Sequence, residues 1–260
     1  MMILLIDAGN TRIKWAATDM DAEPGRWSTF GSVAHEQLEQ LAFAWRDLHL
    51  SRVIVSNVAG KPVRDRLEQI LSSISGNGAV TPEWFVSSPA CGGVRNGYRQ
   101  PQQLGSDRFA SAVGARSLFP DRALLIATCG TATTVDAISA DGIFTGGMIL
   151  PGLKLMAGSL ARNTAQLPEV IAQGEHLPLF ADNTEEAIVS GCISAQIGAI
   201  ERAFAGFVRR YPDEPIQCIV SGGAGALIAS YLAIPCIHVD NLVLPGLQVV
   251  AQQPSQNAPC

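Results

Sequence analysis

The stretch LLIDAGNTRIK, residues 4–14, runs from apolar residues into an acid and turns at once through glycine, asparagine and threonine. Residues 2–6 and 12–18 are apolar enough for two buried strands, and Gly9 and Asn10 between them favour a tight turn. The stretch therefore predicts a β-hairpin at the start of the fold. Asp7 lies where the first strand meets the turn.

The turn after Asp7 has the chemistry of a phosphate-binding loop. Gly9 lets backbone N–H groups approach a phosphate without a Cβ in the way, and Asn10 and Thr11 add side-chain donors. A magnesium ion between Asp7 and the phosphates, bound directly or through water, would offset the cost of burying the carboxylate. The alternative is that Asp7 only caps its own turn through an Asx hydrogen bond.

The same plan returns in the second half of the chain. Residues 122–139, RALLIATCGTATTVDAIS, again give an apolar strand, a Gly-x-Thr turn and a second strand, which suggests a duplicated lobe. The turn at Gly130, Thr131 and Thr133 has the same potential donors as the first. Two such turns could hold the two ends of a polyphosphate.

Strands alternate with helices along the rest of the chain, which is typical of an α/β protein, and the hairpin that opens each half makes the sheets mixed. Ser106 is a predicted helix N-cap, and Asn183 with Glu186 forms a capping-box pattern. Helices are expected at 35–48, 61–74, 106–119, 153–163, from 183 onward and at 226–232; strands at 52–57, 83–88, 217–223 and 235–240; a long loop at 91–105; and a hairpin-like segment at 141–152.

The long helix that begins near residue 183 has two faces. One is an apolar stripe with steps of four and three residues, which predicts burial. The other consists of small residues and admits close approach of another helix, either within the chain or across a dimer. The stripe is Ile193, Ile197, Ile200, Phe204 and Phe207, and the small-residue face is Gly191, Ala195 and Gly198.

The composition argues against several classes of protein. A net charge of −5 with no block of basic residues argues against nucleic acid or an anionic membrane as the main partner. Six cysteines, Cys260 among them, follow no zinc or C-x-x-C spacing, so we expect reduced thiols. The N-terminus lacks the basic region of a signal peptide, and the apolar run at 187–200 is too short to span a bilayer. We therefore expect a cytoplasmic protein.

Asp107 opens the helix of residues 106–119, where the helix dipole favours its ionised form and makes it a weak base. Phosphoryl transfer needs little more, because its transition state is loose and the acceptor hydroxyl mainly has to be oriented. Arg108 beside it could pair with a substrate carboxylate, and Tyr98 and Arg99 lie upstream in the same segment. The alternative is a helix-capping acid followed by a surface arginine.

Five motifs in order, DAGNTRIK, NGYRQPQQLGSDR, CGTATTVD, GGMILPGL and NTEEAI, span nearly the whole chain. Together they resemble the type III pantothenate kinases, also called Bvg accessory factor-like proteins. The resemblance implies the fold of the acetate kinase, sugar kinase, Hsp70 and actin superfamily, with two ribonuclease-H-like lobes, here 1–117 and 118–260, of mixed sheets with helices on both faces. It also implies a homodimer that phosphorylates the 4′ hydroxyl of pantothenate with ATP, the first step towards coenzyme A.

The resemblance assigns roles residue by residue. It makes Asp107 the proton acceptor, Asp7 the residue nearest the metal, and Thr184 a pantothenate contact reached across the dimer. The implied ATP contacts are Asp7, Ala8, Gly9, Asn10, Thr11, Arg12, Ile13, Lys14, Thr131, Gly222 and Gly223. The implied pantothenate contacts are Tyr98, Gly105, Ser106, Asp107, Arg108 and Thr184.

One position departs from the family pattern. The family usually has Asp-x-Gly-Thr before the second turn, and that acid binds potassium or ammonium, whereas Thr128 stands there in this chain. A threonine oxygen carries no charge to balance a cation, so we expect altered or absent dependence on monovalent cations.

Other functions remain open from the sequence. A non-catalytic nucleotide-binding regulator would not need Asp107, and an ATPase without an acceptor site would not need Tyr98 and Arg108. The turn at 221–227, with Asp240 after it, also invites a dinucleotide-binding interpretation. Ile228 stands where that motif requires glycine or alanine, which disfavours it.

Overall fold

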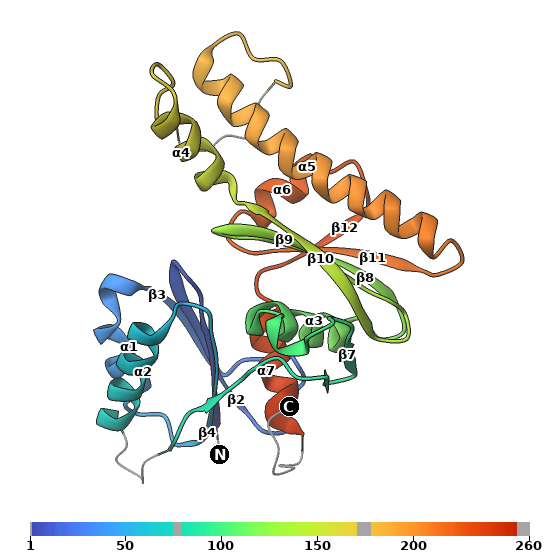
Figure 1. Ribbon diagram of the computed structural model, residues 1–260. Coiled ribbons are helices and arrows are strands. Elements are labelled where there is room, and N and C mark those ends of the chain that lie inside the picture. The colour runs from blue at the N-terminus through green and yellow to red at the C-terminus, as the bar shows by residue number, and fades with distance from the viewer. Residues whose placement is uncertain (1, 75–79, 171–177, 254–260) are drawn as a thin grey trace. The chain divides into compact units, whose positions relative to one another are not determined.

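The computed structural model describes residues 2–74, 80–170 and 178–253, and they form two compact units (Figure 1). Unit 1 comprises residues 1–121, 142–144 and 241–260, and unit 2 comprises residues 122–141 and 145–240. The chain thus enters unit 1 three times. A single division after residue 117 would assign the last helix to the second lobe, whereas that helix packs in unit 1.

The sheet of unit 1 has five strands in the order β3-β2-β1-β4-β5. β1 and β2 form the predicted antiparallel hairpin, β3 extends it, and β4 and β5 add parallel strands on the other side of β1. The strand expected at 83–88 is shorter than predicted. The strands are β1 Met2–Ala8, β2 Arg12–Asp19, β3 Thr29–Ala34, β4 Leu50–Asn57 and β5 Glu83–Trp84.

Helices cover both faces of this sheet. α1 (Glu39–Trp45) and α2 (Lys61–Ile74) bury their apolar residues against one face, where Trp15 and Trp45 meet edge to face with ring centroids 6.0 Å apart. The expected helix at 35–48 is confirmed in part, because residues 35–37 form the 3-10 turn η1 (His35–Gln37) instead. α3 (Ser106–Leu118) and α7 (Val243–Gln252) contact β4 from the other side.

The crossing of α3 and α7 brings together segments far apart in the sequence (Figure 1). The crossing is so close that a Cβ on Gly246 would overlap the carbonyl oxygen of Ala110, and a Cβ on Gly114 would overlap that of Leu242. Glycine at both positions is therefore a packing requirement. α7 was not predicted, because Pro245 and Gly246 disguise its helical pattern.

Residues 91–105 are more ordered than the predicted long loop. They contain parts of two short strands, β6 (Ala90–Cys91) and β7 (Val94–Asn96), and the 3-10 turn η2 (Pro101–Gln103). β7 pairs with Ile143 and Phe144. The prediction of an irregular loop is wrong there, because those two residues return to unit 1 and supply a strand partner.

Unit 2 holds the second hairpin. β8 (Ala123–Cys129) and β9 (Ala132–Ile138) pair antiparallel, as predicted, and β11 (Ile216–Ser221) and β12 (Cys236–Val239) continue the sheet in parallel on the other side of β8. The hairpin expected at 141–152 is wrong. Those residues form one strand, β10 (Ile143–Pro151), because the chain stays extended through Gly146 at a φ of 139°.

Helices α4 (Leu153–Asn163), α5 (Thr184–Arg210) and α6 (Gly225–Tyr231) pack in the core of unit 2. Asn183 caps α5 as predicted, accepting a hydrogen bond of 3.0 Å from the backbone N–H of Glu186. The apolar stripe of α5 packs in this core, and Ile200 within it has no exposed surface. The small-residue face behaves differently: Gly191 and Gly198 are exposed and have open space where a Cβ would stand.

Five cysteines are free thiols, as expected, and Cys260 lies outside the described residues. Burial raises the pKa of Cys129 to about 11 and that of Cys218 to about 12, so both stay protonated at neutral pH. Among the residues that the structure describes, no helix is long and apolar enough to cross a bilayer.

Candidate active site

The turn after β1 is held by the strands that flank it. Asp7 lies opposite Lys14 on β2 and beside Ser56 on β4 in the register of the sheet. The turn is closed by a hydrogen bond of 3.2 Å from the N–H of Gly9 to the carbonyl oxygen of Arg12. The central strand therefore fixes one acid and one lysine at the same edge of unit 1.

Residues of β3 and η1 brace the outside of this turn. His35 Nε2 lies 2.8 Å from the carbonyl oxygen of Gly9, and because that oxygen can only accept, Nε2 is the protonated ring nitrogen. Arg12 donates from Nε to Ser32 Oγ at 2.8 Å. The guanidinium of Arg12 is therefore engaged with β3.

The side chains of the segment Asp7–Lys14 divide into two groups. Ala8 and Ile13 have no exposed surface and belong to the core of unit 1, so only their backbone groups could meet a nucleotide. Asn10, Thr11 and Arg12 are exposed. The polar members expected to contact ATP are therefore accessible.

Asp7 is half-buried, and burial raises its pKa from 3.8 to about 6. A hydrogen bond from Asn241 and the positive charge of Lys14 oppose the rise, while the negative charge of Asp107 adds to it. Asn241 Nδ2 donates to Asp7 Oδ2 at 2.9 Å. Asp7 is thus tied to a residue 234 positions away, which goes beyond an Asx contact with its own turn.

Asp107 lies in the first turn of α3. Its Oδ1 accepts a hydrogen bond of 2.8 Å from the backbone N–H of Arg108, which lowers its pKa, but burial outweighs this and raises the pKa above the usual value. A Cβ on Gly105 would lie 2.7 Å from that same Oδ1. Glycine at 105 therefore leaves room for the carboxylate.

Ser106 is not the N-cap that the sequence predicted. Gly105 occupies the N-cap position, and Ser106 is the first residue of the helix. The Oγ of Ser106 lies 3.0 Å from the Oγ of Ser56 instead. Ser106 thus connects the start of α3 to the strand beside Asp7.

Arg108 is buried, so the alternative of a surface arginine is wrong. Its Nη1 donates to the hydroxyl of Tyr98 at 3.0 Å, and its guanidinium carbon lies 5.7 Å from the ring centroids of both Tyr98 and Phe144. The two rings meet edge to face. This aromatic setting orients the guanidinium, whose planar array of donors suits a carboxylate.

The second turn is braced from two sides within unit 2. The N–H of Gly130 donates to the carbonyl oxygen of Ala132 at 3.0 Å, and the N–H of Gly152 donates to that of Thr131 at 3.0 Å. Gly222, with a φ of 91°, packs so closely that a Cβ would lie 2.6 Å from the carbonyl oxygen of Cys129. The fold therefore brings Thr131 and Gly222 into one neighbourhood, and Gly223 follows as an exposed residue.

Thr128 is the second-to-last residue of β8 and lies among other hydroxyl groups. In the sheet register it pairs with Thr134 on β9 and Ser221 on β11. Thr134 Oγ1 donates to Asp136 Oδ2 at 3.3 Å. In the described parts of the chain no group of three or more His, Cys, Asp or Glu residues could hold a metal ion.

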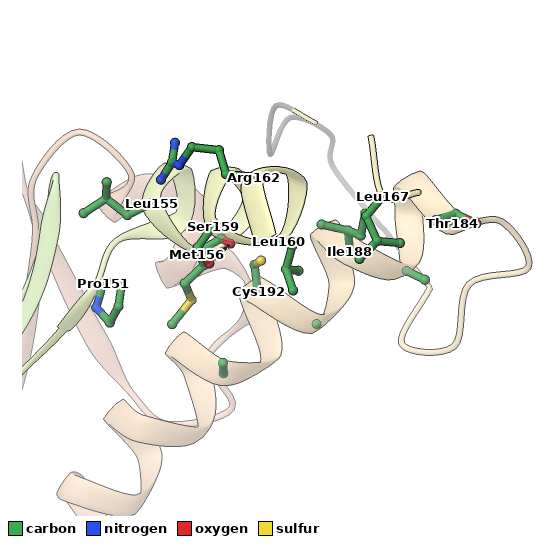
Figure 2. Close-up of a pocket in the computed structure, with 13 residues that line it drawn as sticks. Pro151, Leu155, Met156, Ser159, Leu160, Arg162, Leu167, Thr184, Ile188 and Cys192 are labelled. Atoms are coloured by element: carbon green, nitrogen blue, oxygen red, sulfur yellow. Dashed lines mark hydrogen bonds between the residues drawn. The ribbon is translucent and has the colours of Figure 1, made fainter. Parts of the chain in front are cut away.

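Thr184 lines an apolar pocket of about 780 Å³ between α4 and α5 (Figure 2). Leu155 and Leu160 from α4 and Ile188 and Cys192 from α5 supply much of its wall. The pocket belongs wholly to unit 2, whereas Tyr98, Asp107 and Arg108 belong to unit 1. The structure thus does not bring Thr184 together with the other expected pantothenate contacts within one unit.

Sequence reasoning missed four residues of this site: His35, Ser56, Phe144 and Asn241. Asn241 precedes the first turn of α7, so predicting that helix would have suggested Asn241 as a capping residue. His35, Ser56 and Phe144 have no such local signal, because their partners come from other parts of the chain.

A family model and the curated relatives identify the same family. The family model described as type III pantothenate kinase matches residues 3–206. The chain is 57% identical over 257 residues to the type III pantothenate kinase of Janthinobacterium sp. (strain Marseille), covering 98% of this chain and 99% of that protein. It is 55% identical over 253 residues to the one from Herminiimonas arsenicoxydans, covering 96% and 97%.

A solved structure supports the fold. A chain from Sinorhizobium meliloti, provisionally named as a 2-dehydro-3-deoxygalactonokinase protein, matches with a TM-score of 0.58 and covers 96% of this chain and 98% of that one. Its sequence identity is 15%, so the match concerns the fold alone. The expected actin-like α/β class, with mixed sheets, is confirmed.

Proposed function

Because the chain belongs to the type III pantothenate kinase family, we propose that it transfers the terminal phosphoryl group of ATP to the 4′ hydroxyl of pantothenate. The products are ADP and 4′-phosphopantothenate, and the reaction is the first step of coenzyme A biosynthesis. One observation carries the assignment of roles. Asp7 and Asp107 come from different segments of unit 1, yet the start of α3 is joined to the strand beside Asp7, because Ser106 Oγ lies 3.0 Å from the Oγ of Ser56, the residue that pairs with Asp7 in the sheet.

Asp107 is the acceptor-side acid in this proposal. Its carboxylate orients the hydroxyl of pantothenate and takes the hydroxyl proton as the new P–O bond forms and the bond from the terminal phosphorus to the oxygen of ADP breaks. Burial supports this role, because a raised pKa makes Asp107 a better base than an exposed aspartate. Gly105 leaves space for the carboxylate, and Ser106 fixes the start of the helix.

Arg108 and Tyr98 recognise the carboxylate of pantothenate. The aromatic rings of Tyr98 and Phe144 hold the guanidinium of Arg108, so little side-chain freedom is lost when it pairs with an anion. Asp107 and Arg108 are consecutive residues at the start of α3, so one helix start supplies both the acid for the hydroxyl and the guanidinium for the carboxylate at the other end of the substrate.

ATP meets the two turns. In unit 1 the turn at Gly9 offers the backbone N–H groups of Asn10 and Thr11 and the side chains of Asn10, Thr11, Arg12 and Lys14 to the phosphates. In unit 2 the proposed contacts for the rest of the nucleotide are Thr131, Gly222 and Gly223. Asp7 suits a magnesium ion shared with the phosphates, because magnesium commonly takes one or two carboxylates and keeps several waters. When bound, magnesium neutralises phosphate charge during transfer.

A homodimer completes the proposal. Unit 2 exposes large apolar side chains, and two of them, Leu155 and Leu160, line the same pocket as Thr184 and Gly191. Exposed apolar patches mark interaction surfaces. Thr184 would serve pantothenate bound to the partner. We also propose a cytoplasmic location, where ATP is available. Because Thr128 carries no charge to balance a cation, we propose that dependence on potassium or ammonium is altered or absent. The exposed apolar side chains include Met148, Ile149, Leu155, Leu160, Leu179 and Phe180.

The test is an ADP-release assay with and without pantothenate, on the wild type and on Asp107→Asn. We expect ADP release to require pantothenate and to fall by about 10²- to 10⁴-fold in the variant. Asp47→Asn is the matched control, because Asp47 is an exposed acid of the same unit. Equal ADP release without pantothenate would indicate an ATPase, and binding of nucleotide without any turnover would indicate a regulator.

A further inference from the structure

Asn241 joins two parts of unit 1 through the two ends of one side chain. Its Nδ2 donates to Asp7 Oδ2 at 2.9 Å, and its Oδ1 accepts from the backbone N–H of Leu244, in the first turn of α7, at 2.8 Å. Asn241 lies just before α7, whereas Asp7 is the second-to-last residue of β1, the central strand of the sheet. A single amide therefore spans from a helix start to the acid of the first turn.

The orientation of this amide is determined by its partners. The N–H of Leu244 can only donate, so the oxygen of Asn241 must face it, and an ionised Asp7 can only accept, so the nitrogen must face the carboxylate. A flipped amide would lose both hydrogen bonds. Asn241 thus holds one oxygen of Asp7 in a single arrangement and leaves the other, Oδ1, for a ligand.

The end of the link on α7 is firmly anchored. Gly246 and Gly114 let α7 pack directly against the backbone of α3, so the helix has no room to shift towards it. Gln248, which has no exposed surface, donates from Nε2 to the carbonyl oxygen of Ala22 at 2.9 Å and accepts from the N–H of Gly25 at 2.9 Å. The position of Asn241 is therefore set by the core of unit 1.

We propose that Asn241 is a positioning residue of the kinase, which aims the carboxylate of Asp7 at the magnesium–nucleotide complex by occupying Oδ2 from the start of α7. The inference rests on the proposed role of Asp7. It adds a residue, outside the motifs at 7–14 and 105–108, whose effect on nucleotide binding passes through Asp7 alone.

Calorimetry on the full chain measures how tightly the protein binds the complex of magnesium with a non-hydrolysable ATP analogue. Asn241→Ala should weaken binding by about tenfold, the factor that corresponds to a hydrogen bond with a charged group. Asn241→Ser should weaken it similarly, because its shorter side chain still offers an acceptor to the start of α7 but does not reach Asp7. Gln252→Ala is the control: it also removes an amide of α7 that bonds unit 1, to the carbonyl oxygens of Met20 and Ala22, and should leave affinity unchanged.

A double-mutant cycle separates this role from a structural one. Asp7→Asn should weaken binding at least as much as Asn241→Ala, and adding Asn241→Ala to Asp7→Asn should change it less than about twofold. An undiminished effect of Asn241→Ala in the Asp7→Asn background would overturn the inference. If Asp7→Asn weakens binding but the Asn241 variants do not, only this inference fails, whereas unchanged binding in Asp7→Asn overturns the proposed role of Asp7 as well.

Discussion

The hairpin of β1 and β2 and the hairpin of β8 and β9 are built on the same plan. In each, a central strand has an antiparallel neighbour on one side and a parallel neighbour on the other, and its second-to-last residue lies beside a serine of the parallel strand. That residue is Asp7 in unit 1 and Thr128 in unit 2. The serines are Ser56 and Ser221.

The residues around Asp7 differ from those around Thr128, just as the charged side chain of Asp7 differs from the neutral side chain of Thr128. Asp7 faces Lys14 across the hairpin and receives a hydrogen bond from Asn241, whereas Thr128 faces a second threonine, Thr134. Two hairpins with the same strand pairing therefore place a charged side chain at this position in unit 1 and a neutral side chain in unit 2. The carboxylate that we propose as the magnesium ligand therefore has no counterpart at the matching position of the second hairpin.

The largest expected effect comes from copying the neutral residue into unit 1. Asp7→Thr removes the one carboxylate of the turn and should lower kcat/KM by at least about 100-fold, because nothing else in the segment 7–14 replaces it as a magnesium ligand. Steady-state kinetics over a range of magnesium concentrations measures this. Asp19→Thr, an exposed acid at the end of β2, is the control and should retain full activity. A fully active Asp7→Thr would remove the functional difference between the hairpins.

The second prediction concerns the other acid of unit 1. Gly105→Ala places a methyl group against Asp107 Oδ1, where the Cβ would lie 2.7 Å away, so the carboxylate must move. We expect kcat to fall by about tenfold or more while affinity for the nucleotide stays the same. Gly206→Ala, at a site in α5 whose nearest atom is 3.8 Å away, should change neither quantity. A loss of nucleotide affinity in Gly105→Ala would show that residue 105 serves the nucleotide instead.

A third prediction makes the opposite exchange, from the neutral residue to the acid. Thr128→Asp gives unit 2 the charge that it lacks, and a carboxylate beside Ser221 and Thr134 provides oxygen ligands with a balancing charge for potassium. Activity of the variant should rise about threefold or more on replacing sodium by potassium, whereas the wild type should change less than about twofold. Strong potassium activation of the wild type would contradict the expectation drawn from Thr128.

The smallest effect is on stability. Burial raises the pKa of Asp7 from 3.8 to about 6, so between roughly pH 4 and 6 the folded state binds more protons than the unfolded state. Stability from this group is therefore lost as pH rises through that window, by at most about 3 kcal/mol. Asp7→Asn should raise Tm by a few degrees at neutral pH and flatten this part of the pH profile. Thermal unfolding at pH 4, 6 and 8 tests it, and a lower Tm at neutral pH would show that the ionised acid is stabilising.

The sequence predicted those features whose causes are local. Both hairpins follow from apolar runs and turn residues, and the cap of α5 follows from Asn183 and Glu186, three positions apart. The hairpin expected at 141–152 is a single strand, because glycines such as Gly146 and Gly147 indicate a bend unless neighbouring strands keep the chain extended. Helix α7 is not predicted from the sequence, because Pro245 and Gly246 indicate a break in a helix unless tertiary packing stabilises it.

The sequence was enough to predict several residues of the candidate site, but not which distant residues they contact. Asp7 and Asp107 stand out as acids at a strand end and a helix start, yet the burial of Arg108 depends on Phe144, which returns from a distant segment. The link from Asn241 to Asp7 spans 234 positions and leaves no periodic signal. Long-range contacts of this kind become visible only when the units are folded.

The crossing of α3 and α7 has a consequence for how the protein forms during synthesis. Unit 1 contains β1, which is made before every other described strand, but α7 packs against β1, β4 and the glycines of α3 and comes from residues 243–252. The first unit to be started is thus the last to be finished. Until those residues have been translated, the apolar face that α7 covers stays open and Asn241 cannot reach Asp7.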